Sequence, residues 1–405
     1  MSTQRPADIL FLAHRIPYPP DRGDKIRSFN IVRRLSEIAP VHIATFADDD
    51  ADAAHAAGLR EALGGKLASL YVERRSRSKA VSLVAGTLKG RSASMAAFSS
   101  RAMRGYVDDL VCANPISTVF AFSGQMAQYA SDNAGKTRFV MDFVDVDSAK
   151  MESYARDAAP PLSWLYAREA AQLAREERVV ASRADVSLFV TDAEAALFRT
   201  RCGAGVGDVR TLENGVDLAF FDLDTSFAPL VRTAAGPVLV FSGQMDYAPN
   251  VAAVSHFARE TLPLVRRDVS DATFAIVGRN PAPAVRALDA LEGVEVVGAV
   301  PDMRPWLSAA DVVVAPLQIA RGIQNKILEA MAMGRPVVAS PAAFEGIDAE
   351  PGRDLLVTEH AAAAVLSLLR DPDYACRLGS NARSRMCARY AWDRQLAALS
   401  EIVTG

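Results

Sequence analysis

The most constraining feature of this sequence is a repeated alternation between short apolar runs and longer amphipathic segments. In the segment 27–38, for example, every third residue from Phe29 to Ile38 is apolar, which places these side chains on one face of a helix. The apolar runs between such segments are bounded by polar and turn residues, as buried strands are. Strands that alternate with helices form parallel sheets covered by helices, so the sequence predicts an α/β fold.

The alternation occurs in two halves, separated by the segment 217–236, which has no clear period. We therefore expect two domains, 1–218 and 219–388. The expected helices include 27–38, 51–63, 251–265 and 324–333. The expected strands are 9–13, 41–46, 67–72, 117–122, 138–144, 186–190, 238–241, 272–277, 294–297, 311–315 and 336–339. Ligands of open parallel sheets bind beyond the carboxyl ends of the strands, and two facing domains would place these ends around one cleft.

Composition excludes several other classes of protein. The 405 residues include 45 Lys+Arg and 48 Asp+Glu, and a net charge of −3 argues against a dedicated nucleic-acid binder. No apolar run reaches the length of a membrane span, and the run 9–13 is too short for a secretory signal. We expect a cytoplasmic protein without a bound metal, because no two of its four cysteines form a CxxC pair.

The segment 316–336 carries the strongest indication of chemistry. It follows a predicted strand, bends at Gly322 and opens a helix, whose free N–H groups suit a phosphate. Arg321 and Lys326 add positive charge, and Glu329 lies one turn further on, where it could accept hydrogen bonds from ribose hydroxyls. The alternative is a surface helix in which Lys326 and Glu329 form an ordinary exposed pair.

The run Glu329-Ala330-Met331-Ala332-Met333-Gly334-Arg335-Pro336-Val337-Val338 resembles the nucleotide-sugar-binding element of retaining glycosyltransferases of family four. The resemblance implies the GT-B fold, which has two facing Rossmann-like domains, and a C-terminal helix at about 389–405 that packs back on the first domain. It implies that Glu329 holds the donor ribose and that Lys326 contacts the phosphates. At the position of the first carboxylate in the family pattern, this sequence has Arg321, which could instead neutralise the diphosphate.

Further stretches resemble the same family in order along the chain. The sequence Glu213-Asn214-Gly215-Val216-Asp217 is similar to the loop that closes the first domain. The sequence 241–246 corresponds to a Gly-Arg motif, but Gln244 stands in place of the arginine and Asn250 in place of a frequent lysine. The donor-binding residues implied by the resemblance are Gly243, Gln244, Gly278, Arg279, Val300, Gly322, Ile323, Gln324, Asn325 and Glu329.

The loop after the first strand is rich in charge. It contains His14, Arg15, Arg22, Gly23 and Asp24, and the resemblance implies a position near the donor phosphates and the acceptor. Because Gly23 has no side chain, its backbone could closely approach a ligand. The alternative is a polar loop in which Asp24 caps the following helix.

Three carboxylates, Asp142, Asp145 and Asp147, close the strand 138–144. We expect them to share one face of an extended segment. Relatives keep an acidic or histidine side chain here that reaches the reacting sugar, and Asp145 is the best match, with Asp142 next. We therefore assign Asp145, Lys326 and Arg321 as catalytic. The alternative is that Asp147 or Ser148 caps the next helix.

The segment 71–106 contains eight basic residues, one acid and an internal apolar stretch. It could contact anionic lipid at the inner face of the cell membrane, which would suit a lipid-linked acceptor, or it could be a solvated helix and loop.

The sequence thus predicts a retaining glycosyltransferase that uses a nucleoside-diphosphate sugar as donor and no permanent cofactor. Its acceptor would be a glycan or a lipid-linked molecule, and the order of motifs resembles bacterial sugar transferases of exopolysaccharide synthesis. A nucleotide-sugar 2-epimerase has the same fold but needs histidines, which are scarce here. A non-catalytic scaffold is the third hypothesis, because the first motif carboxylate is absent at Arg321 and the Gly-Arg arginine is replaced by Gln244.

Overall fold

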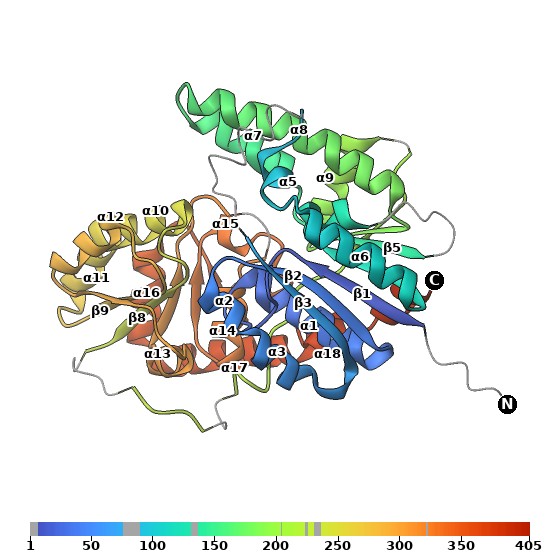
Figure 1. The fold of residues 1–405 in the computed structure, drawn as a ribbon. Helices are drawn as coiled ribbons and strands as arrows, with labels where there is room; N and C mark the ends of the chain where they lie inside the picture. Colours follow the sequence, from blue (N-terminus) through green and yellow to red (C-terminus); the bar gives the residue numbers. More distant parts are fainter. Residues whose placement is uncertain are drawn as a thin grey trace. The chain divides into compact units, whose positions relative to one another are not determined.

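The computed structural model describes residues 7–75, 90–130, 137–203, 205–222, 226–230, 236–320 and 323–405 (Figure 1). The chain forms two compact units. The first consists of Met1–Glu213 together with Gln395–Gly405, and the second of Asn214–Arg394. Each unit is an open parallel sheet with helices packed on it, as the alternating pattern of the sequence predicts.

The sheet of the first unit has the order β3-β2-β1-β4-β5-β6-β7, with every neighbouring pair parallel. The six strands predicted in this half are confirmed. The edge strand β7 was not predicted, because its four residues contain a single large apolar side chain, Val209. The strands are β1 (Asp8–Ala13), β2 (Val41–Ala47), β3 (Leu67–Arg74), β4 (Ile116–Phe122), β5 (Arg138–Val144), β6 (Val186–Phe189) and β7 (Asp208–Thr211).

The helices of the first unit follow the predicted periodicity with two differences. Helix α1 begins at Gly23, one turn before the predicted start, and the predicted helix 51–63 is divided at His55. Helix α1 packs on β1 and β2, and α8 packs on β5. The helices are α1 (Gly23–Ile38), α2 (Asp50–Ala54), α3 (Ala56–Leu63), α5 (Ala93–Ala97), α6 (Arg101–Ala113), α7 (Asp147–Asp157), α8 (Leu162–Arg183), α9 (Asp192–Cys202) and α19 (Leu399–Thr404).

The sheet of the second unit has the order β10-β9-β8-β11-β12-β13 and is also parallel throughout. The five predicted strands are confirmed, and the two-residue β13 was too short to predict. The strands are β8 (Val238–Ser242), β9 (Thr273–Val277), β10 (Val294–Gly298), β11 (Val312–Ala315), β12 (Val337–Ala339) and β13 (Leu356–Val357).

The helices of the second unit connect these strands. Helices α14 and α16 both pack on β11 and β12. The predicted helix 251–265 is one continuous helical stretch with a π-helical segment at Phe257–Thr261. The α-helices are α10 (Ala248–His256), α11 (Leu262–Asp268), α12 (Pro283–Arg286), α13 (Arg304–Ala309), α14 (Asn325–Ala332), α15 (Pro341–Phe344), α16 (Ala361–Arg370), α17 (Pro372–Arg389) and α18 (Trp392–Gln395).

In each sheet the first and fourth strands of the unit lie side by side, β1 with β4 and β8 with β11. The direction in which successive strands are added reverses at this point. Loops that leave the two central strands therefore diverge and leave room for a ligand at the carboxyl edge. This topology directs attention to the residues that follow β8 and β11.

The end of the chain completes the first unit, although it follows the second unit in sequence. Helix α19 packs against α1, β4 and β5. Thr118 Oγ1 donates a hydrogen bond to Val403 O at 2.8 Å, and Arg138 Nε donates to Ile402 O at 2.6 Å. The side chains of Leu399 and Ile402 are buried. Within the described ranges, the chain contains no helix with the length and hydropathy needed to cross a bilayer.

Candidate functional site

Two glycines connect the carboxyl ends of β8, β9 and β10 by backbone hydrogen bonds. Gly243 N donates to Val277 O at 3.0 Å, and Gly278 N donates to Gly298 O at 2.8 Å. A Cβ atom on Gly278 would overlap the carbonyl oxygen of Gly243. A residue with a side chain therefore does not fit at position 278 without movement of the loop after β8.

Lys326, in the first turn of α14, lies against the loop after β8. Its Nζ donates to Asn250 Oδ1 at 2.7 Å and lies 4.1 Å from the centre of the Phe241 ring. Asn250 Nδ2 in turn donates to Gln244 O at 2.8 Å. A Cβ on Gly243 would lie 3.1 Å from Lys326 Nζ. The structure therefore brings together Lys326, Gly243, Gln244 and Asn250, which are separated by up to 83 positions in the sequence, 326 − 243.

The charges of Lys326 and Glu329 are poorly solvated. Burial lowers the pKa of Lys326 to about 7, although the nearby charge of Glu329 opposes this shift. Burial likewise raises the pKa of Glu329 to about 7, against the charge of Lys326. Among the described residues, no hydrogen-bond or ion-pair partner is found for the Glu329 carboxylate. This carboxylate is available to accept hydrogen bonds from a ligand.

Within the described residues, the start of α14 also has an unpaired polar atom, on the side chain of Asn325. Gln324 occupies the N-cap position in an extended conformation, and its side chain does not cap the helix. Asn325 Oδ1 is buried and has no hydrogen-bond partner in the described part of the chain. Ile323, two residues before Asn325, is buried. Arg321 and Gly322, two further predicted site residues, lie outside the described residues.

The remaining predicted donor residues lie at the same edge of the second sheet. Gly278 and Arg279 directly follow β9, and Val300 follows β10 and packs against the core of the unit. Arg279 is partly buried. Together with the residues around Lys326, they form a row along the carboxyl ends of β8, β9, β10 and β11.

In the first unit, the loop after β1 is organised around Asp24. Its carboxylate lies 3.1 Å from Arg15 Nη1, 2.9 Å from Arg22 Nε and 3.4 Å from His14 Nε2. Burial opposes ionisation, but the hydrogen bond and charge of His14 and the two guanidinium groups outweigh it and hold the pKa of Asp24 well below its usual range. Asp24 is therefore a fixed anion that binds its own loop together.

Asp24 is not the helix cap that the alternative reading of this loop proposed. Helix α1 begins at the exposed Gly23, and Arg22 occupies the N-cap position. The Asp24 carboxylate accepts a hydrogen bond from the backbone N–H of Lys25 at 3.0 Å and otherwise faces the loop cations. The ion pairs with His14 and the two arginines, which sequence could not show, hold the carboxylate away from the capping geometry.

All four basic residues of the loop have a carboxylate partner. Besides the pairs with Asp24, Arg15 Nε lies 3.1 Å from Asp48, and Lys25 Nζ lies 2.8 Å from Asp52. Arg27 is fully buried and pairs with Asp142. Three of these acids, Asp48, Asp52 and Asp142, come from other segments of the chain, so the sequence of the loop alone does not show that its cations are paired. His14 stacks on Phe122 with ring centres 5.8 Å apart.

The three carboxylates in and after the end of β5 do not share one face, so that prediction is wrong. Asp142 is buried in the strand and accepts two hydrogen bonds from Arg27, at 2.9 and 3.2 Å. Val144 has a φ of +70°, which ends the extended segment, and Asp147 is the first residue of α7. Positions 142 and 145 also differ by an odd number, which places their side chains on opposite sides of a strand.

Asp145 is the carboxylate of this group that retains an unpaired buried oxygen. Its Oδ1 has no hydrogen-bond partner among the described residues. Burial raises the pKa of Asp145 to about 6, and the neighbouring charge of Glu194 adds to this shift. A carboxyl group with this pKa can exchange a proton near neutral pH.

Two buried glutamates that sequence reasoning missed hold the loop around Asp145. Glu194 accepts a hydrogen bond from Val146 N at 2.7 Å, and Glu177 accepts from Ser148 N at 2.9 Å and Ser148 Oγ at 2.6 Å. Burial raises the pKa of Glu177 to about 7, although the Ser148 hydrogen bonds oppose this shift. The available signal was a carboxylate on the apolar face of α8, in helical register with the buried Leu173.

Within the described residues, no group of three or more His, Cys, Asp or Glu side chains is arranged to hold a metal ion. The basic segment 71–106 is described only in part, because residues 76–89 lie outside the described residues. Of its described cations, Arg74 lies 2.9 Å from Asp50 and Arg75 lies 2.7 Å from Asp48.

Comparison with known proteins gives a match over most of the second unit. Residues 236–371 match the family described as "Glycosyl transferases group 1". The chain is 30% identical over 167 residues to the phosphatidyl-myo-inositol mannosyltransferase of Propionibacterium freudenreichii, covering 39% of each protein. It is 31% identical over 257 residues to D-inositol 3-phosphate glycosyltransferase 2 of Catenulispora acidiphila, covering 57% of this chain and 58% of the relative. The matched regions thus span less than two thirds of these relatives.

Solved structures resemble the chain over nearly its whole length. Sucrose-phosphate synthase from Thermosynechococcus elongatus superposes with a TM-score of 0.68 at 16% identity, covering 98% of both chains. The HepE protein of Anabaena, solved in complex with UDP and glucose, gives a TM-score of 0.68 at 15% identity and covers 98% of this chain and all of that one. TarM gives 0.67 at 12% identity over both full chains. These neighbours have the GT-B fold, which confirms the fold prediction.

Proposed function

We propose that this chain is a glycosyltransferase that transfers a sugar from a nucleoside-diphosphate donor to an acceptor. The observation that carries the proposal is the position of Lys326. Asn250 holds its ammonium beside Gly243, in the first turn of a helix whose N-cap side chain leaves the terminal N–H groups uncapped. The match of residues 236–371 to group 1 glycosyl transferases supports the same assignment.

For the donor, we assign the diphosphate to Lys326 and to the N-terminal N–H groups of α14, with Arg321 and Gly322 next to them in sequence. Glu329 would accept hydrogen bonds from the ribose, since its carboxylate has no other partner in the described part of the chain. The loops with Gly243 and Gln244, with Gly278 and Arg279, and with Val300 would hold the base and sugar. HepE has been solved with UDP and with UDP-glucose, so UDP is the first nucleotide to test.

For the chemical step, the leaving diphosphate gains negative charge as the bond to the sugar breaks. Lys326 and the helix N-terminus would stabilise this charge, and preorganised groups of this kind supply a large part of many enzymatic rate enhancements. We propose retention of configuration by same-face attack and assign no protein nucleophile. Asp145, with its raised pKa, is the proposed group of the first unit that takes part at the reacting sugar, and the His14–Asp24 loop is proposed to position the acceptor.

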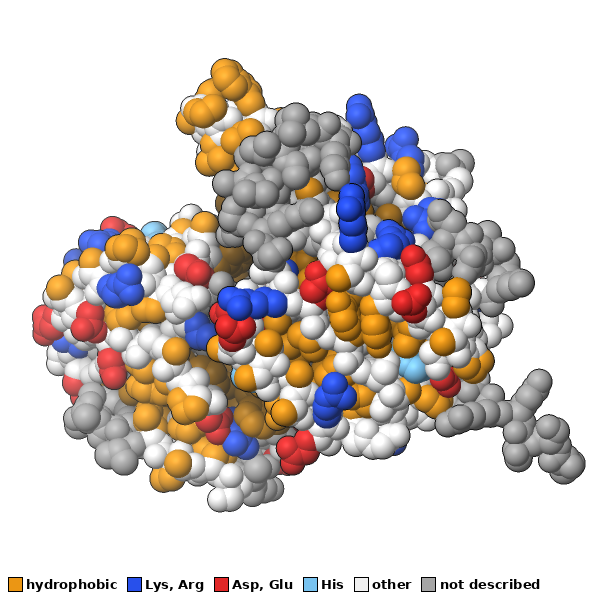
Figure 2. All heavy atoms as spheres, in the orientation of Figure 1, with side chains coloured by type: hydrophobic (Ala, Val, Ile, Leu, Met, Phe, Trp, Pro, Cys, Tyr) orange, Lys and Arg blue, Asp and Glu red, His pale blue; other side chains and the backbone are white. Residues whose placement is uncertain are grey.

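The proposed acceptor is a glycan or a lipid-linked molecule of bacterial exopolysaccharide synthesis, used at the inner face of the cell membrane. Two features support a lipid surface nearby. The segment 71–106 is rich in basic residues, and Leu162, Trp164 and Leu165 are exposed where α7 and α8 meet. Figure 2 shows hydrophobic side chains gathered at this projecting tip, and Trp164 is 70% exposed. Aromatic side chains at such tips favour the membrane interface.

The site assignment is tested by titrating UDP and uridine into purified variants. Glu329→Ala should weaken UDP binding about tenfold or more, as expected for lost hydrogen bonds to a charged group. Lys326→Ala should weaken UDP binding more than uridine binding, since uridine has no phosphate. Glu359→Ala, an exposed glutamate of the same unit, is the matched control and should bind as the wild type does. Wild-type UDP affinity in Glu329→Ala would refute the site.

The reaction is tested by incubating the protein with UDP-, GDP- and ADP-sugars and following the products by NMR. Release of nucleoside diphosphate with retained anomeric configuration in the product supports the transferase. An isomerised nucleotide sugar would identify an epimerase instead. Absence of binding to every nucleotide would favour a non-catalytic scaffold, which the replacement of the family arginine by Gln244 makes worth testing.

A further inference from the structure

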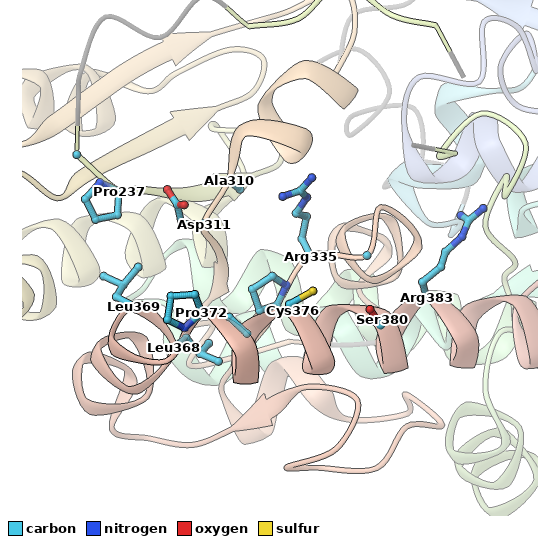
Figure 3. A pocket seen from close by; sticks show the side chains of 14 residues that line it. Pro237, Ala310, Asp311, Arg335, Leu368, Leu369, Pro372, Cys376, Ser380 and Arg383 are labelled. Atoms are coloured by element: carbon cyan, nitrogen blue, oxygen red, sulfur yellow. The ribbon is translucent and has the colours of Figure 1, made fainter. Parts of the chain in front are cut away.

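A cavity lies at the amino-terminal edge of the sheet in the second unit, opposite the donor edge (Figure 3). Its volume is about 790 Å³, and its wall includes the residues that immediately precede β8, β11 and β12, namely Pro237, Asp311 and Pro336. Helices α16 and α17 form the other wall. Because the predicted donor residues follow the strands, this cavity is separate from the site of the proposed function.

Arg335 is a charged lining residue whose side chain the protein leaves without a partner in the described part of the chain. It lies between the end of α14 and β12, and its side chain has no hydrogen-bond or ion-pair partner among the described residues. Its Nε is buried. Burial lowers the pKa of this guanidinium, against the charges of Asp311 and Cys376, but an arginine stays protonated. A buried guanidinium nitrogen without a protein acceptor is unfavourable, and an acceptor supplied by a ligand would satisfy it.

The other charged lining residues are already used by the protein. Arg383 Nη1 donates to Phe221 O and to Ala332 O, both at 2.6 Å. Asp311 Oδ2 accepts a hydrogen bond from Val238 N at 2.7 Å. These groups hold the fold, whereas the guanidinium of Arg335 is left to bind something else.

The wall opposite Arg335 is apolar. Leu368 is buried, and Leu369, Pro372 and Ala375 complete this surface from α16 and α17. Figure 3 shows Arg335 and Asp311 on one side of the opening and Leu368, Leu369 and Pro372 on the other. The cavity thus combines the guanidinium group of Arg335 with an apolar wall. Its volume lies within the range of small-molecule pockets.

We propose that this cavity binds a small organic anion, with a carboxylate on the Arg335 guanidinium and an apolar body against α16 and α17. The planar guanidinium matches a carboxylate in a two-bond geometry. Among the described lining residues, Arg335 is the one cation without a partner, and it lies close to Asp311, which favours a monovalent group over a diphosphate. The apolar wall accounts for the rest of the ligand, since it would gain from burial against Leu368 and Leu369.

Cys376 provides a direct test, because it lines the cavity and is exposed. The probe is 4-phenylbutanoate, with its uncharged amide as the comparison, and alkylation of each cysteine by iodoacetamide is followed by mass spectrometry. At ten times its dissociation constant the acid should slow alkylation of Cys376 about tenfold by mass action. The exposed Cys112 and Cys387 lie outside the lining and should react at unchanged rates. The amide should give less than a third of the protection, as should UDP.

Three variants locate the site. Arg335→Gln should lose the protection of Cys376 by 4-phenylbutanoate, whereas Arg377→Gln, an exposed arginine of α17 outside the lining, should retain it. Ser380→Trp, at an exposed lining position, should fill the cavity and abolish protection independently of Arg335. Thermal unfolding checks that each variant is folded. If Arg335→Gln unfolds, the Ser380→Trp comparison decides alone.

The proposal is overturned if acid and amide protect Cys376 equally, or if Arg335→Gln or a folded Ser380→Trp is protected as well as the wild type. It is also overturned if all three exposed cysteines slow alike, or if UDP protects Cys376 and so places the nucleotide in this cavity. None of these measurements requires transferase activity. Failure of the proposed function would therefore leave this test intact.

Discussion

At the scale of single residues, the charges of this protein differ in how they are compensated. Asp24 and Arg27 are each surrounded by opposite charge, whereas Lys326 is held by the neutral side chain of Asn250. A charge that is paired with an opposite charge stabilises the fold and does not change its protonation near neutral pH. A charged group whose partner is neutral, such as Lys326, can gain or lose a proton when a ligand binds.

The affinity for UDP should fall as pH rises above 7. Burial lowers the pKa of Lys326 to about 7, so above this pH the site must take up a proton before the lysine can pair with a diphosphate. The loss should approach tenfold for each pH unit, until the pH reaches the raised pKa of Lys326 in the complex. The last phosphate proton of UDP dissociates near pH 6, so the charge of the diphosphate is constant above pH 7. The N3–H group of uracil ionises in more alkaline solution, so the comparison is confined to pH 8 and below.

Calorimetric titrations at pH 7, 7.5 and 8 measure this loss, and buffers of different ionisation enthalpy report the proton uptake. Uridine should show a flat profile. Lys326→Arg should also be flat, since arginine stays charged. Glu329→Gln in the same series separates the titration of Glu329, whose raised pKa lies at about 7, from that of Lys326. A pH-dependent loss that persists in Lys326→Arg would assign the titration to another group.

Arg27→Met should destabilise the first unit by about 3–5 kcal/mol, because it leaves the buried Asp142 carboxylate without its partner. The matched control on the same helix is Arg34→Met, which removes an exposed pair with Glu37 at 2.7 Å and should cost less than about 1 kcal/mol. Urea denaturation measures both values. Equal losses in the two variants would contradict the structural role given to Arg27.

At the scale of elements, the two loops after β8 and β9 behave as one unit at the donor edge. They are joined by backbone hydrogen bonds from Gly243 to Val277 and from Met245 to Arg279. Lys326 and Asn250 pack directly against Gly243. A displacement of one loop should therefore also move the side chains that we assign to the diphosphate.

Gly278→Ala should weaken UDP binding about tenfold or more, since its Cβ would overlap Gly243 O and force the loop after β8 to move, and a small misplacement in a site can cost this much. The matched control is Gly352→Ala, a position with a φ of +83° and no atom within 4 Å of the added Cβ. It should lose about 1 kcal/mol of stability from backbone strain and bind UDP normally. Unchanged UDP binding in Gly278→Ala would show that the two loops move independently.

At the scale of the whole molecule, the first unit is completed by contacts between distant parts of the chain. The first unit needs the residues 395–405, whose helix α19 packs on β4 and β5. Deletion of 395–405 should therefore destabilise the first unit and leave the second, which precedes this segment in sequence, unaffected. Because Leu399 and Ile402 are fully buried, the deletion should cost several kcal/mol, roughly 2 kcal/mol for each large side chain.

Hydrogen exchange measured by mass spectrometry tests this outcome. Protection should fall in β4 and β5 and remain in β8 and β11. Glu401→Ala is the control within the same helix, since it removes only an exposed pair with Arg210 at 3.0 Å. Loss of protection in the second sheet alone would contradict the assignment of this segment to the first unit.

Most elements of the fold could be predicted because their causes are local. A buried strand such as β8 is an apolar run, and a helix such as α14 is a periodic one, so the neighbours in sequence are sufficient to identify both. The segment with Lys326 and Glu329 could be singled out for the same reason, since the helix start and the charged residues are consecutive. The short β7 and β13 were missed because they contain too few apolar residues to give a pattern.

The series of strands and helices, the α/β class and the segment proposed to hold the donor are therefore predictable from the order of residues alone. The folded structure was needed to find the strand order, the pairing of Arg27 with Asp142, the support of Lys326 by Asn250 and the cavity beside Arg335. These features depend on groups that are far apart in the chain. A charge is identifiable in the sequence, but whether it is neutralised, buried or available depends on which distant residues the fold places against it.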